Sequence, residues 1–103
     1  MRIIVHAHHS EIPDGLRARA ERAASKLAGW LDRPVGATVC FEQDGPERRV
    51  EITLRASHRR SVVAVGHDRR YGTALAQAVS RVEAQVRRLK RTPKSRGAAV
   101  SRP

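Results

Sequence analysis

The segment from Arg70 to Arg91 has the clearest periodic pattern in this 103-residue sequence. Its larger apolar residues recur three or four positions apart, and this spacing places them on one stripe of an α-helix. The rest of that helix is basic, with Glu83 as its one acidic residue after Tyr71. We therefore expect the stripe to pack against a sheet while the other sides face water or an anionic partner. The stripe consists of Leu75, Val79, Val82, Val86 and Leu89.

Five further segments have the pattern of a helix or a strand. A first helix is expected from Pro13 to Leu31, with Ser10 or Asp14 as its N-cap. Its predicted buried face consists of Leu16, Ala20, Ala23, Leu27 and Trp30. The predicted strands are Ile3 to His6, Val35 to Glu42, Arg48 to Ala56 and Ser61 to Gly66. Alternation places these side chains on the buried face of the two middle strands: Val35, Ala37, Val39, Phe41, Val50, Ile52 and Leu54.

The predicted order is strand, helix, strand, strand, strand, helix. Short turns make the last three strands an antiparallel meander, and the first helix allows the first strand to lie parallel to the second. Asp68 is the expected N-cap of the last helix. We therefore predict an α+β fold, a two-layer sandwich in which a four-stranded sheet carries both helices on one face. One domain is expected over residues 1–91, followed by a basic, disordered tail over residues 92–103.

The formal net charge is +11 and the pI is about 11.6. Such a charge does not help a compact domain to fold, because like charges repel one another. It is typical of a protein whose partner carries many phosphates. A genome rich in Arg codons would be an alternative source of part of the excess, since Arg outnumbers Lys.

The basic residues of the two helices are the candidate RNA-binding site. Arg81 and Arg88 lie seven positions apart and share one flank of the last helix. Packed side by side, the helices would present one flank each as a single basic surface suited to phosphate contacts. Only Tyr71 is free for base stacking, so helical RNA recognised by shape fits better than single strands. Helical spacing assigns Arg19, Arg22, Lys26, Arg81, Arg87, Arg88 and Arg91 to this site.

No catalytic residues are predicted, because the acidic residues are scattered and no glycine-rich phosphate loop precedes a helix. Cys40 is the single cysteine, so an intrachain disulfide is impossible and a reducing, cytoplasmic location is expected. No segment is long and apolar enough for a membrane. We expect no metal and no cofactor. The distant alternative is a small enzyme or metal protein that uses His6, His8 and His9, for which the sequence specifies no further ligand.

Several segments together resemble the short ribosome hibernation-promoting factors, the family of protein Y, the ribosome-associated translation inhibitor also described as sigma-54 modulation protein. Arg70-Tyr71-Gly72 departs from this pattern, because the family often has Asp-Met-Tyr there. The likeness spans Arg2 to Arg91, and the segments that carry it are Ile12–Arg17, Lys26–Leu27 with Trp30, Arg49–Leu54, Thr73–Leu75 and Arg81–Lys90.

The resemblance implies a fold similar to double-stranded RNA-binding domains and a stress-response role as a translation inhibitor. It implies binding in the mRNA/tRNA channel of the small ribosomal subunit, against rRNA and neighbouring ribosomal proteins, by a chain that is monomeric off the ribosome and has no small-molecule substrate. The alternative is a general double-stranded RNA- or nucleic-acid-binding module that is not specific to the ribosome. The positions that match basic family residues facing rRNA are Arg17, Lys26, Arg81, Arg87, Arg88 and Lys90.

Overall fold

The computed structural model describes residues 2–8, 11–57 and 60–99, with side chains as far as residue 89. Its elements follow the predicted order, so the strand and helix assignments are confirmed with small shifts at their ends. The bounds are β1 Arg2–His8, α1 Asp14–Ala28, β2 Pro34–Asp44, β3 Glu47–Ala56, β4 Arg60–Asp68 and α2 Tyr71–Ala99.

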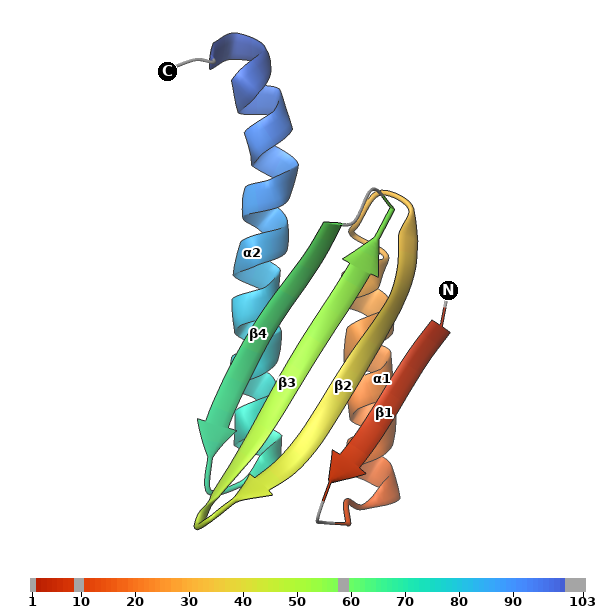
Figure 1. Ribbon diagram of the computed structural model, residues 1–103, viewed down its shortest axis with the longest axis vertical. Coiled ribbons are helices and arrows are strands. Elements are labelled where there is room, and N and C mark those ends of the chain that lie inside the picture. The colour runs from red at the N-terminus through yellow and green to blue at the C-terminus, as the bar shows by residue number, and fades with distance from the viewer. Residues whose placement is uncertain (1, 9–10, 58–59, 100–103) are drawn as a thin grey trace.

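The four strands form one sheet in the order β1-β2-β3-β4. β1 is parallel to β2, and the other two pairs are antiparallel. Figure 1 shows both helices on the same side of the sheet, α1 behind β1 and β2 and α2 behind β4. The predicted α+β sandwich is therefore confirmed, and the opposite face of the sheet is left uncovered by helices.

The core lies between the sheet and the two helices. Val50, Ile52 and Leu54 of β3 are fully buried, as alternation predicted. Val35 was expected beside them, but its side chain is 54% exposed. The pairing of β2 with β3 is irregular between Pro34 and Gly36, so the alternation is interrupted there and Val35 turns away from the core.

The helix α1 begins at Asp14, directly after Pro13. The carbonyl oxygen of Pro13 accepts hydrogen bonds from the amides of Leu16 and Arg17, each at 3.1 Å. The expected N-cap is wrong for Asp14, because Pro13 holds that position without a side-chain cap. Ser10, the other candidate, lies outside the described residues.

The buried face of α1 is rotated slightly from the predicted one. Ala24 is fully buried, whereas Ala23 and Leu16 are only partly buried. The helix also ends before Trp30, whose amide donates to the Leu27 carbonyl oxygen three residues back. Trp30 is half-buried at the margin of the core rather than inside it. The fully buried positions of this face are Ala20, Ala24, Leu27 and Ala28.

The start of α2 is anchored by Tyr71, which is buried and meets the Phe41 ring edge-on at a centroid distance of 5.3 Å. Tyr71 is therefore not available for stacking on bases, contrary to expectation. The guanidinium of Arg48 lies 5.3 Å from the Tyr71 ring. Asp68 precedes the helix by three residues, and its Oδ2 accepts a hydrogen bond from the Arg70 amide at 3.0 Å. These contacts hold the helix start at the point where the sequence departs from the family pattern.

The backbone of α2 remains helical as far as Ala99. The sequence predicted an irregular tail from residue 92, and this is wrong for residues 92–99. Pro93 lies inside this helix, where it removes one backbone hydrogen bond and its ring crowds the carbonyl group of residue 89, so it destabilises this part of the helix by about 3 kcal/mol. Leu89 is the last residue of α2 seen packing on the core, and Figure 1 shows the helix extending beyond the sheet. The domain boundary at residue 91 stays a prediction.

Gly66 of β4 is the point at which α2 comes closest to the sheet. A Cβ atom at this position would lie 2.0 Å from the Ala74 carbonyl oxygen and 2.9 Å from the Ala78 amide nitrogen. Both neighbours are backbone atoms of α2, so they cannot yield as a flexible side chain would. The helix can lie against β4 only because residue 66 has no side chain.

We predict that Gly66→Ala lowers the free energy of unfolding by about 1–3 kcal/mol, because α2 must move away from β4. Gly15→Ala is the matched control. Nothing lies within 4 Å of a Cβ at Gly15, and alanine there is expected to stabilise the helix by about 0.5–1 kcal/mol. Urea unfolding followed by circular dichroism measures both. Equal stabilities of the Gly66 variant and the wild type would contradict the close contact.

Candidate nucleic-acid interface

The positive charge of the chain is concentrated in the helices. The strands carry as many acids as bases: Arg2, Arg48, Arg49, Arg55 and Arg60 against Glu42, Asp44, Glu47, Glu51 and Asp68. The helices carry more bases than acids among their described side chains: Arg17, Arg19, Arg22, Lys26, Arg81, Arg87 and Arg88 against Asp14, Glu21 and Glu83. The helical layer is therefore the side of the molecule that attracts a polyanion.

On α1, three of the predicted residues are exposed. Arg19, Arg22 and Lys26 all lie at the surface, and the Lys26 ammonium is 5.9 Å from the centroid of the Trp30 ring. Arg17 differs from them, because it is half-buried and its Nη1 donates to the Val5 carbonyl oxygen at 3.0 Å. Val5 lies on the edge strand β1, so Arg17 ties α1 to one edge of the sheet.

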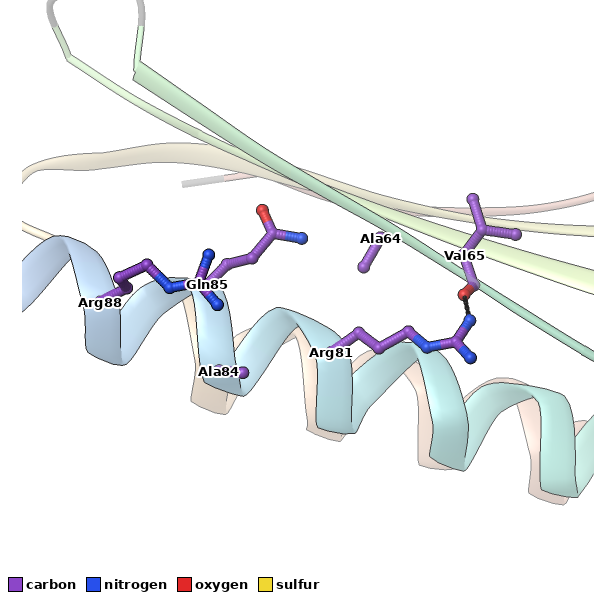
Figure 2. Close-up of a pocket in the computed structure, with 6 residues that line it drawn as sticks. All are labelled: Ala64, Val65, Arg81, Ala84, Gln85 and Arg88. Carbon is purple, nitrogen blue, oxygen red and sulfur yellow. Dashed lines mark hydrogen bonds between the residues drawn. The ribbon is translucent and has the colours of Figure 1, made fainter.

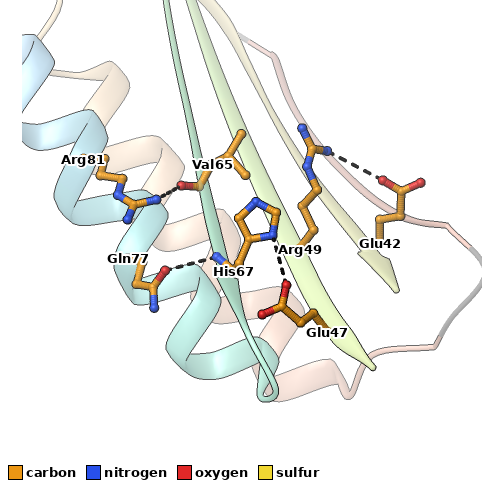
Figure 3. A network of polar contacts seen from close by, with 7 residues as sticks. All are labelled: Glu42, Glu47, Arg49, Val65, His67, Gln77 and Arg81. Carbon is orange, nitrogen blue, oxygen red and sulfur yellow. Dashed lines mark hydrogen bonds and ion pairs between the residues drawn. The ribbon is translucent and has the colours of Figure 1, made fainter. Parts of the chain in front are cut away.

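On α2, Arg81 has the equivalent role at the opposite edge. Its guanidinium donates to the Val65 carbonyl oxygen of β4 (Figure 2). Gln85 Nε2 donates to the Val63 carbonyl oxygen at 2.8 Å. One turn earlier, the His67 amide donates to Gln77 Oε1 at 3.0 Å (Figure 3). The edge of β4 is therefore bonded to side chains of α2 at three alternate residues.

We call the three side chains Gln77, Arg81 and Gln85 the edge ladder. Their spacing along α2 explains why each reaches a backbone group of β4. Four residues of a helix advance by about 6 Å. Two residues of a strand advance by about 6.7 Å. Side chains four apart on α2 therefore stay in step with alternate residues of the antiparallel β4. Sequence reasoning missed the two glutamines, although their four-residue spacing with Arg81 was visible.

The expectation of one joint basic surface is wrong for Arg81 and Arg88. Both line the β4 side of α2, whereas α1 packs over β1 and β2, toward the opposite edge of the same sheet face. The reason is that Ala74 and Ala78 are fully buried and belong to the centre of the packed face. They turn the helix so that the Arg81 flank meets the strand edge instead of the neighbouring helix.

The remaining predicted residues of α2 lie further along the helix. Arg87 and Arg88 are exposed. The side chains of Lys90 and Arg91 lie outside the described residues, so their assignment to the site stays a prediction. The RNA-binding role of the whole set likewise stays a prediction, while Arg17 and Arg81 also have a structural role.

A hollow of about 510 Å³ lies between α2 and the edge of β4. Figure 2 shows Arg81 and Gln85 extending from α2 toward β4, whereas Val65 faces the helix with its carbonyl oxygen and points its side chain away. Two alanines leave the space open, and basic and amide groups surround it. The lining residues are Ala64, Val65, Arg81, Ala84, Gln85 and Arg88.

The uncovered face of the sheet carries mixed charges. Arg49 lies 3.6 Å from the carboxylate of Glu42, and His67 Nδ1 lies 3.9 Å from Glu47 Oε1 (Figure 3). Arg49 also lies 3.6 Å from the carboxylate of Glu51. Exposed pairs of this kind contribute little to stability. Because these charges balance locally, this face has no excess charge to attract phosphates.

Cys40 lies on the same face. Burial raises the pKa of its thiol, the carboxylates of Glu51 and Glu42 raise it further, and Arg49 lowers it. A thiol with a raised pKa stays protonated at neutral pH and is a poor nucleophile.

Metal binding gains no support from the described part of the chain. The rings of His6 and His8 are 6.0 Å apart, and His9 lies outside the described residues. Among the residues that the structure describes, no three His, Cys, Asp or Glu side chains are grouped so that they could hold a metal ion. No helix in this part of the chain has the length and apolar character needed to cross a membrane.

Residues 3–94 match the family described as sigma 54 modulation protein / S30EA ribosomal protein. Because the match covers most of the sequence, the chain belongs to this family. The N-terminal domain of Protein Y from Thermus thermophilus is a similar solved structure, with 28% sequence identity and a TM-score of 0.73. That similarity covers 86% of this chain and 99% of the Protein Y domain.

A ribosomal subunit interface protein from Coxiella burnetii has the same fold, with a TM-score of 0.79 over 89% of this chain and 100% of that one. At 14% sequence identity, this likeness supports the fold alone. No match was found among curated proteins. The family resemblance inferred from sequence segments is thus confirmed.

We predict that Gln77→Ala increases the hydrogen-exchange rate of the His67 amide about three- to tenfold, because one hydrogen bond typically contributes about 1 kcal/mol. Arg87→Ala, on the outer side of the same helix, is the matched control and should leave that amide unchanged. Exchange measured by NMR tests both variants. Unaltered protection of His67 in the Gln77 variant would show that the edge ladder does not hold β4.

Proposed function

We propose that this protein is a ribosome-binding translation inhibitor, or hibernation factor, that occupies the mRNA/tRNA channel of the small ribosomal subunit. Membership of a family that includes S30EA ribosomal proteins supports a ribosomal partner. The similarity to the N-terminal domain of Protein Y points in the same direction. The observation that carries the proposal is the concentration of positive charge in the helical layer over a neutral sheet.

In this proposal the helical layer faces rRNA and the sheet faces away from it. Arginine and lysine side chains neutralise phosphates, which gives affinity without sequence reading. The body of the domain then excludes mRNA and tRNA by volume, so the protein acts by binding and not by catalysis. The proposed contacts are Arg17, Arg19, Arg22, Lys26, Arg81, Arg87, Arg88, Lys90 and Arg91.

The residues of this set differ in what they can contribute. Arg19 and Arg22 are exposed on α1. Arg17 and Arg81 each use one guanidinium nitrogen on an edge strand. A guanidinium has five N–H donors, so donors remain for a phosphate. The proposed partners are rRNA and neighbouring ribosomal proteins in the cytoplasm, with the protein monomeric off the ribosome and without a cofactor.

We predict that Arg19→Gln with Arg22→Gln weakens binding to small subunits about 30-fold at 0.1 M salt and reduces the salt slope by about 1.5, since two phosphate contacts are lost. Arg2→Gln with Arg55→Gln removes the same charge from the sheet and is the matched control. It should bind nearly as the wild type does. Sedimentation with small subunits over a salt series measures both pairs. Equal effects of the two pairs would mean that the helical layer is not the binding side.

The alternative is a general module for double-stranded RNA on the same fold. Its support is that phosphate contacts from helices do not depend on the ribosome. Competition separates the two functions. A random RNA duplex added in equal amount should not displace the protein from small subunits if the proposed function holds, and displacement would favour the general module.

A further inference from the structure

The hollow between α2 and β4 contains polar groups that are already held in position. Arg81 and Gln85 are bonded to the carbonyl oxygens of Val65 and Val63. A side chain fixed in this way has lost much of its rotamer freedom before any ligand arrives. Further ordering by a ligand therefore costs less than it would for a freely moving surface side chain.

These groups keep unused hydrogen-bonding capacity. Gln85 uses one N–H on Val63, which leaves the other N–H and the amide oxygen. Arg81 likewise keeps most of its donors, and Arg88 lines the same hollow. An amide offers a donor and an acceptor side by side, which matches the edge of a nucleobase. The two guanidinium groups match a phosphate.

The hollow is open to solvent and has room for one nucleotide beside its polar lining. Its volume is about 510 Å³, and Ala64 and Ala84 leave room where larger residues would fill it. No acidic residue is among the described residues that line it, so nothing there repels a phosphate. A base-paired strand keeps its base edges inside the duplex, whereas an unpaired nucleotide can extend its base to a protein.

We infer that this hollow binds one unpaired nucleotide of structured RNA, with its phosphate on Arg81 and Arg88 and its base edge on the Gln85 amide. The inference rests on the proposed RNA-binding function and adds which kind of nucleotide the β4 side of α2 accepts. Duplex phosphates contact the exposed basic side chains, while the hollow selects for an extruded base beside them.

The test compares two RNA hairpins that differ only by one bulged nucleotide. The wild-type protein is expected to bind the bulged hairpin about tenfold more tightly than the fully paired one, the effect of one bidentate contact between an amide and a base edge. Ala84→Leu fills the hollow without changing charge and should remove this preference. Ala76→Leu is the matched control, because Ala76 is an exposed alanine of the same helix outside the hollow. It should keep the preference.

NMR titration of the wild type with the bulged hairpin gives a direct readout. The side-chain amide of Gln85 should shift, and that of Gln43, in the β2–β3 turn region, should not. Equal affinity for both hairpins, or a preference that survives Ala84→Leu, would overturn the inference. A free nucleoside monophosphate that binds as tightly as the bulged hairpin would overturn the assignment to RNA.

The wild-type protein alone separates this inference from the proposed function. Sedimentation of the wild-type protein with small subunits tests the ribosomal role, whatever the hairpins show. If the wild type sediments with small subunits while the hairpin preference is absent, the hollow is not a nucleotide site and the proposed function stands. If it does not sediment, the proposed function fails.

Discussion

The rest of this structure depends on the direct contact between α2 and β4 at Gly66. A side chain at this position would overlap the backbone of Ala74, so the helix rests on the strand itself. Ala74 and Ala78 are fully buried at this contact. Such close packing brings the next flank of the helix within reach of the strand edge. The edge ladder of Gln77, Arg81 and Gln85 therefore follows from one missing side chain and two small ones.

The two layers differ in charge, because the helices carry an excess of bases and the sheet carries equal numbers of bases and acids. Like charges gathered on one layer repel one another and oppose folding, and salt or a polyanion relieves this repulsion. The apolar faces of the sheet and of both helices pack together, and their burial supplies the stability that offsets this repulsion. The two sides of the domain therefore differ in how strongly they attract a polyanion. One that approaches from the sheet side meets balanced ion pairs such as Arg49 with Glu42.

Much of the fold could be predicted from the sequence, because alternation and helical periodicity report burial directly. Val50, Ile52 and Leu54 were placed correctly for this reason. Val35 was misplaced because the irregular pairing at Gly36 leaves no mark in the alternation. The site was less predictable. Hydrophobic patterns give little weight to alanine, so Ala74 and Ala78 were missed and the Arg81 flank was oriented towards the wrong neighbour.

Arg81 shows how one residue can serve the fold and the proposed site together. An exposed edge strand is a template for pairing with other chains, and side chains bonded along it remove that risk. The same bond fixes the guanidinium beside Gln85 and the hollow. Loss of Arg81 would therefore disturb the strand edge and the anion contacts at once. A substitution at Ala84 changes only the volume of the hollow. It therefore tests the proposed nucleotide site without removing the Arg81 bond that holds the strand edge.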